Sequence, residues 1–104
     1  MRALSATLVL LIAALFPAGA AAPGTVPPRG AALANACAAC HGPNGRSQGA
    51  IPSIDTLSVE DFRTALKAFG ADARKGTVMN RIAKGLDDAD IDAVASYFVT
   101  LRQR

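Results

Sequence analysis

The sequence has no tryptophan, one tyrosine, four phenylalanines, one histidine and only two cysteines among its 104 residues. This length excludes two-domain enzymes, α/β barrels and full dinucleotide-binding folds, all of which need longer chains. It also lacks any internal repeat and any alternation of apolar and polar residues long enough for a useful strand. The sequence therefore predicts one small all-α domain.

The longest hydrophobic run lies at the N-terminus. Arg2 precedes an uncharged stretch over residues 3–16, and small residues follow over residues 17–22. This pattern is typical of a secretory signal peptide, and the apolar run is short for a transmembrane span. We expect a signal peptide at residues 1–20, cleaved near residues 20–22, and a periplasmic protein without a membrane span. An uncleaved anchor is the alternative.

Large apolar residues are scarce after this segment. Between residues 21 and 104, only 19 of 84 positions carry Val, Leu, Ile, Phe, Met or Tyr. A domain this small rarely stabilises itself through an apolar core alone. We therefore expect a disulfide, a metal or a large cofactor to contribute to its stability.

The mature chain begins with three short segments of different character. Residues 21–28, with three prolines and a glycine, are expected to form an extended leader. The folded domain is expected at residues 29–104, and it opens with an alanine-rich helix over residues 29–39. Residues 42–52 contain three glycines and two prolines, so they are expected to form a loop.

Two amphipathic helices are expected in the second half of the chain. Ser58 is a good cap for the first of them, which has one apolar face and ends at Gly70. Asp87 is a similar cap for the second, which has aspartates in its first turn. Residues 77–85 between them are expected to form one or two helical turns.

Cys37, Cys40 and His41 form the motif C-x-x-C-H, which is the attachment pattern for haem c. Two thiols three residues apart on one helical turn can each bond a vinyl group on the same porphyrin edge. The histidine that follows would then lie beneath the iron as its proximal ligand. The motif thus predicts a single covalently bound haem c.

Other uses of two cysteines fit the sequence less well. A thioredoxin-like dithiol site requires a βαβ unit, and no strands are predicted. A structural zinc site requires four ligands, whereas the chain offers two cysteines and one histidine. A disulfide between the two cysteines remains open, although the loop that it would close is very small and would add little stability.

Met79 is the predicted distal ligand of the iron. It is the one methionine left after signal cleavage, and the chain has no second histidine. A thioether ligand raises the reduction potential relative to a second imidazole. Core packing is the alternative role for this methionine, and ligation by Lys67, Lys75 or Lys84, or a five-coordinate iron, also remains open.

Pro52 is a candidate for holding the proximal histidine. Its carbonyl, at the end of the glycine-rich loop, could accept the Nδ1 proton of His41 and fix the ring; simple stiffening of the loop is the alternative. A bound haem would also supply the missing stability. Burial of roughly 400 Å² of apolar porphyrin, at about 25 cal/mol/Å², would contribute on the order of 10 kcal/mol.

These features together resemble the class I cytochrome c family over nearly the whole mature chain. The resemblance rests on the C-x-x-C-H motif, the proline loop at Pro52, the distal Met79 and a last helix carrying Tyr97. It implies a small cytochrome c fold in which three to four helices wrap around one covalent haem. It also implies that the first and last helices cross near the haem, with Gly30 or Leu33 against Tyr97.

One stretch is similar to a narrower group. Residues 77–85 and 90–98 resemble the monohaem cytochrome subunit of flavocytochrome c sulfide dehydrogenase, a periplasmic complex in which a flavoprotein oxidises sulfide. This resemblance implies an FAD-containing flavoprotein as the electron donor. Asn80 follows Met79, where the broader family commonly has a proline.

We therefore expect an electron-transfer protein that is not itself catalytic. The alternatives are a free-standing small cytochrome c with another donor, or a haem enzyme or sensor with an open distal site. No further histidine and no clear catalytic setting support the enzyme. Nucleic-acid binding is not expected, because ten basic residues face eight acidic ones after loss of Arg2, and two haem propionates would cancel this net charge of +2.

Overall fold

The computed structural model describes residues 28–104; the predicted signal peptide and the leader up to residue 27 lie outside the described residues. None of the helices in this part of the chain is long and apolar enough to cross a membrane. The described residues contain no strand, so the predicted all-α class is confirmed. The elements are α1 (Arg29–His41), the 3-10 turn η1 (Pro43–Gly45), α2 (Val59–Gly70), α3 (Met79–Lys84) and α4 (Asp88–Arg102).

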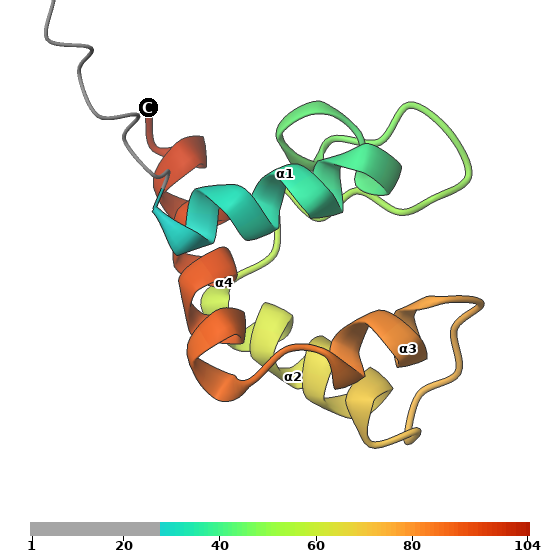
Figure 1. The fold of residues 1–104 in the computed structure, drawn as a ribbon. Helices are drawn as coiled ribbons and strands as arrows, with labels where there is room; N and C mark the ends of the chain where they lie inside the picture. Colours follow the sequence, from blue (N-terminus) through green and yellow to red (C-terminus); the bar gives the residue numbers. More distant parts are fainter. Residues whose placement is uncertain (1–27) are drawn as a thin grey trace, which may run out of the picture.

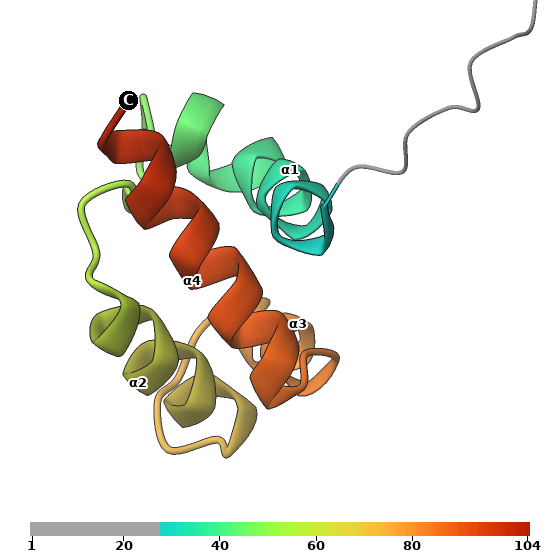
Figure 2. The ribbon, with the colours of Figure 1, turned by 90° about the vertical axis from the view of Figure 1, so that its left-hand side faces the viewer.

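Helix α4 is the central element of the fold. It packs against α1 on one side and α2 on the other, and α3 packs against α2 (Figures 1 and 2). Between residues 28 and 104, α1 and α3 make no contact with each other. The fold therefore keeps these two helices apart, with α1 packed on α4 and α3 packed on α2.

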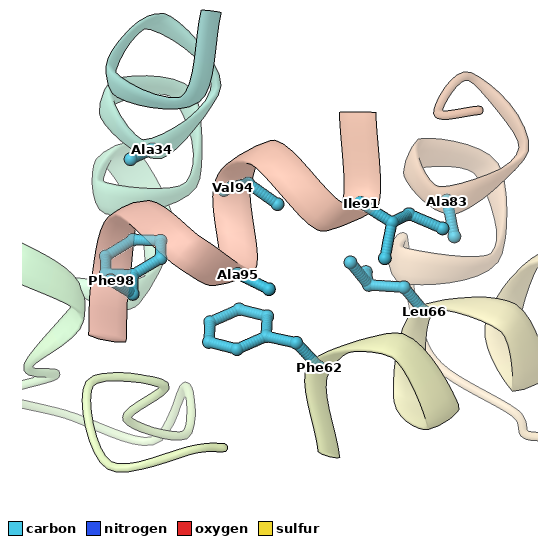
Figure 3. Packing of buried hydrophobic residues seen from close by; sticks show 8 residues of the cluster. All are labelled: Ala34, Phe62, Leu66, Ala83, Ile91, Val94, Ala95 and Phe98. Carbon is cyan, nitrogen blue, oxygen red and sulfur yellow. The ribbon is translucent and has the colours of Figure 1, made fainter. Parts of the chain in front are cut away.

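The core forms where α1 and α2 pack against α4, and α3 adds Ala83 to it from its place on α2 (Figure 3). The rings of Phe62 from α2 and Phe98 from α4 stack at its centre, with centroids 5.5 Å apart and an angle of 11° between their planes. The apolar faces predicted for the two amphipathic helices, α2 and α4, supply most of this core. Its buried members are Ala34, Phe62, Leu66, Ala83, Ile91, Val94, Ala95 and Phe98.

Both predicted helix caps are confirmed. The side chain of Ser58 accepts a hydrogen bond from the Asp61 N–H at 3.0 Å, and the side chain of Asp87 accepts one from the Asp90 N–H at 2.7 Å. In each case the aspartate side chain accepts in return from the N–H of the cap residue. These reciprocal bonds satisfy backbone donors that the first turn of a helix otherwise leaves without partners.

Helices α1 and α4 cross in close contact at Gly30. A Cβ atom on this residue would lie 2.5 Å from the Ala93 carbonyl oxygen and 3.2 Å from Tyr97 Cβ, so only glycine allows the approach. The expected contact between Gly30 and Tyr97 is confirmed. Next to the crossing, Arg29 of α1 forms an ion pair with the buried Asp90 of α4.

Replacement of Asp90 by asparagine is expected to lower stability in a pH-dependent manner. The hydrogen bond from Arg29 holds the pKa of Asp90 below its ordinary value of 3.8. A carboxylate with a lowered pKa stabilises the fold above its unfolded-state pKa, and the contribution is lost as the pH falls through the folded-state value. Urea unfolding midpoints should therefore separate wild type from Asp90→Asn at pH 7, and the gap should be smaller at an acidic pH below 3.8. A gap of equal size at both pH values would contradict this role.

Candidate functional site

The two cysteines lie on the last turns of α1. Cys37 is partly buried against the core, and Cys40 is exposed. No disulfide joins the two cysteines, so both sulfur atoms are available for bonds to a cofactor. Burial raises the pKa of the Cys37 thiol above its ordinary value of 9.0, because the charged thiolate is disfavoured away from water. One thiol thus faces the interior and the other the surface.

His41 ends α1 and contacts the loop that follows it. Its Nδ1 lies 2.6 Å from the carbonyl oxygen of Pro52. A carbonyl oxygen only accepts hydrogen bonds, so Nδ1 must carry the proton. The lone pair of the ring then lies on Nε2, the nitrogen that remains available to a metal. This contact is the one expected of Pro52, and it fixes both the tautomer and the orientation of the ring.

The loop between His41 and α2 is closed on itself. Gly42 has φ of 90°, and a Cβ atom there would lie 2.0 Å from the Arg46 carbonyl oxygen. The Gly45 carbonyl oxygen accepts from the N–H groups of Ile54 at 2.8 Å and Asp55 at 3.2 Å. These bonds bring the second half of the loop back toward α1, and this return lets Pro52 reach the histidine.

Met79 is the first residue of α3, the short helix predicted within residues 77–85. Its side chain is partly buried and packs against the core. Gly76 lies close to it, since a Cβ atom on this glycine would be 3.3 Å from Met79 Cβ. In Figure 1, the end of α1 and the segment around α3 lie on the same side of α4. The structure thus brings Cys37, Cys40, His41 and Pro52 together and holds Met79 on a separate helix.

The residues around this site fit a porphyrin. Three large apolar side chains in the described chain are exposed to solvent, Ile51 at 44 %, Val78 at 54 % and Ile82 at 47 %. The first lies in the loop after the histidine, and the other two flank Met79. An apolar group held between the two segments would cover such side chains and gain stability from their burial. The separation of α1 from α3 leaves this region free of helix–helix contact.

The donor set also fits a porphyrin better than a metal ion bound by protein ligands alone. Within residues 28–104, no three His, Cys, Asp or Glu side chains cluster in a way that could hold a metal ion. Structural zinc sites need four such donors. Iron in a porphyrin already has four nitrogen ligands, so one imidazole nitrogen and one thioether sulfur suffice to complete its coordination.

Two features around the site were not predicted from the sequence. Asn80 makes four side-chain hydrogen bonds next to Met79, and Gly42 is required by the turn after the histidine. The signal for Gly42 was its place directly after a helix end. The hydrogen bonds of Asn80 could have been suspected because a polar residue stands in the first turn of a short helix that has no side-chain cap.

Comparison with known proteins gives a consistent result. Residues 28–102 match the cytochrome c family. The cytochrome subunit of sulfide dehydrogenase from Chlorobaculum tepidum is 43% identical over 76 residues, which cover 73% of this chain and 69% of that protein. Cytochrome c-553 from Helicobacter pylori is 38% identical over 73 residues, covering 68% and 76% respectively.

A larger relative is similar over part of its length. The thiosulfate dehydrogenase electron acceptor from Stutzerimonas stutzeri is 35% identical over 72 residues, which cover 65% of this chain and 33% of that protein. The family match spans most of the chain and includes all the residues of the site. This chain belongs to the cytochrome c family, and it is an electron-transfer protein that carries covalently bound haem c.

Proposed function

We propose that Cys37 and Cys40 would hold the haem through thioether bonds and that His41 and Met79 would supply the two protein ligands of its iron. The single observation that carries this proposal is the contact between His41 Nδ1 and the Pro52 carbonyl oxygen at 2.6 Å. The contact commits one ring nitrogen to the loop and leaves the other with its lone pair, directly after two free thiols.

The bound haem supplies one-electron redox chemistry at its iron. The chain determines how readily this electron moves and where it goes. The Pro52 carbonyl orients the imidazole and increases its basicity by accepting a hydrogen bond from the Nδ1–H group. The thioether of Met79 is a soft, neutral donor that favours the reduced state relative to a second imidazole. Ile51, Val78 and Ile82 keep water away from the ligands once they are covered.

We propose further that residues 1–20 are a signal peptide and that the domain at residues 29–104 works in the periplasm. The support is the sequence pattern of a positive start, an apolar run and small residues before the proline-rich leader.

The proposed electron donor is the FAD-containing subunit of a sulfide dehydrogenase. The support is the 43% identity to a protein named as the cytochrome subunit of that enzyme. The surface near Met79 offers charge for docking. Three basic side chains on α2 and α3 pair with acidic ones. Within residues 28–104, the exposed Arg81 of α3 and the exposed loop residues Arg74 and Lys75 form no ion pair. They are available to attract an acidic partner surface.

Co-purification from the native host tests this donor. The tagged chain should retain a flavin-containing protein, and sulfide should reduce the haem in the purified complex. Thiosulfate added in place of sulfide is the matched control and should leave the haem oxidised. Purification of the chain without any flavin, at a salt concentration low enough to preserve charged contacts, would contradict the proposal.

A free-standing electron carrier is the second candidate. The 38% identity to cytochrome c-553, over 76% of that protein, favours it. Such a carrier would purify as a single chain without flavin and would accept electrons from a donor other than sulfide dehydrogenase. The co-purification experiment therefore separates the two candidates directly.

A further inference from the structure

The side chain of Asn80 makes four hydrogen bonds to the end of α2 and the loop that follows it. Its Nδ2 donates to the carbonyl oxygens of Phe69 at 3.0 Å and Arg74 at 2.7 Å, with a longer contact of 3.3 Å to Asp72 Oδ1. Its Oδ1 accepts from the Gly76 N–H at 2.8 Å. Both functions of the amide are thus directed at one segment of chain.

The first half of the loop at residues 71–78 is held by backbone bonds from the N–H groups of residues 71–74 to α2 and by the ion pair between Lys84 and Asp72, whereas its second half depends on Asn80. The Arg74 carbonyl and the Gly76 N–H have no backbone partner among the described residues. The helix that follows has six residues and no side-chain cap at Val78. Because a helix this short is not stable by itself, the position of its first residue, Met79, depends on the contacts around it.

Gly76 is the point where the loop touches Met79. A Cβ atom on Gly76 would lie 3.0 Å from Phe69 Cε1 and 3.3 Å from Met79 Cβ. The backbone of this glycine therefore passes directly against the stem of the methionine. The Oδ1 of Asn80 accepts a hydrogen bond from the N–H of the same glycine. The amide of Asn80 therefore holds the loop against the side chain of Met79, the residue directly before it in the chain.

We propose that Asn80 is a positioning residue for the sulfur of Met79. Its amide keeps the loop closed over the methionine and so lowers the fraction of molecules in which the sulfur has left the iron. This inference rests on the proposed role of Met79 as a ligand. An external ligand such as imidazole binds only to the open fraction, so its apparent affinity reports how often the loop opens.

Imidazole titration of the oxidised holoprotein tests the proposal. Asn80→Ala removes all four hydrogen bonds, so the apparent affinity for imidazole should rise by more than about fivefold over wild type. A smaller change would overturn the proposal. Ser58→Ala is the matched control, because it removes the cap at the far end of α2 and leaves the loop intact. An equal rise in this control would also overturn it, since the effect would then reflect general loss of stability.

Asn80→Asp is the second test variant, to be used if Asn80→Ala does not incorporate haem. It preserves the size of the side chain and the acceptor for Gly76 and loses both donors, and the same threshold applies to it. Met79→Ala separates failure of this inference from failure of the proposed ligand. If the far-red band of sulfur ligation persists in Met79→Ala, the ligand assignment is wrong and the role of Asn80 falls with it. If Met79→Ala loses the band while both Asn80 variants bind imidazole with wild-type affinity, the positioning role of Asn80 is wrong and the assignment of Met79 as a ligand stands.

Discussion

Protein in which serine replaces both Cys37 and Cys40 is expected to yield almost no folded, haem-containing product. Serine hydroxyls do not form thioethers, so the cofactor loses its covalent attachment. Haem burial contributes on the order of 10 kcal/mol, which is comparable to the 5–15 kcal/mol of net stability of a typical domain. Since the core formed by residues 28–104 contains only eight buried apolar residues, three of them alanines, little stability remains without the cofactor.

Pyridine haemochrome absorbance and far-ultraviolet circular dichroism measure this outcome. The double variant should lose the haemochrome and most of its helical signal, and each single variant should retain part of both. Ala39→Ser is the matched control, because it adds the same hydroxyl at an exposed position between the two cysteines. A double variant with wild-type helix content and no haem would show that the fold does not depend on the cofactor.

Met79→Ala is expected to abolish the weak far-red band of oxidised protein with sulfur ligation and to lower the reduction potential. Loss of the thioether removes the ligand that favours the reduced state. The fall should exceed about 0.1 V, a modest part of the ~0.8 V range over which axial ligands set haem potentials. Absorption spectra and a redox titration measure the two effects.

Val78→Ala is the matched control for this variant. Val78 precedes Met79 and is 54 % exposed, so its truncation changes the same segment without removing a ligand. Its spectrum should retain the far-red band. If Met79→Ala retained the band as well, Met79 would be a packing residue only, and a lysine or an open coordination position would become the better assignment.

The local features of this fold could be predicted from the sequence because their causes lie close together in the chain. The two capping boxes need residues only three positions apart, at Ser58 and Asp61 and again at Asp87 and Asp90. The apolar faces of α2 and α4 follow from helical periodicity within single segments. The C-x-x-C-H motif likewise carries its chemistry within five consecutive residues.

Features that depend on distant residues could not be predicted in the same way. Arg29 and Asp90 are 61 positions apart, and nothing in either segment indicates that they form an ion pair. The four bonds of Asn80 require the loop to return to the end of α2, which follows from tertiary structure and not from any local pattern. The contact of His41 with Pro52 depends on the path of the ten residues between them, so the sequence alone left stiffening of the loop as an equal alternative.

The intact mass of the exported, purified protein under denaturing conditions tests most directly whether one haem is linked to Cys37 and Cys40. Denaturation releases a haem held only by its iron ligands, whereas thioether bonds survive. We predict a single species with the mass of the mature polypeptide plus one haem. A polypeptide without haem, with both thiols free to react with an alkylating reagent, would contradict covalent attachment at these two cysteines.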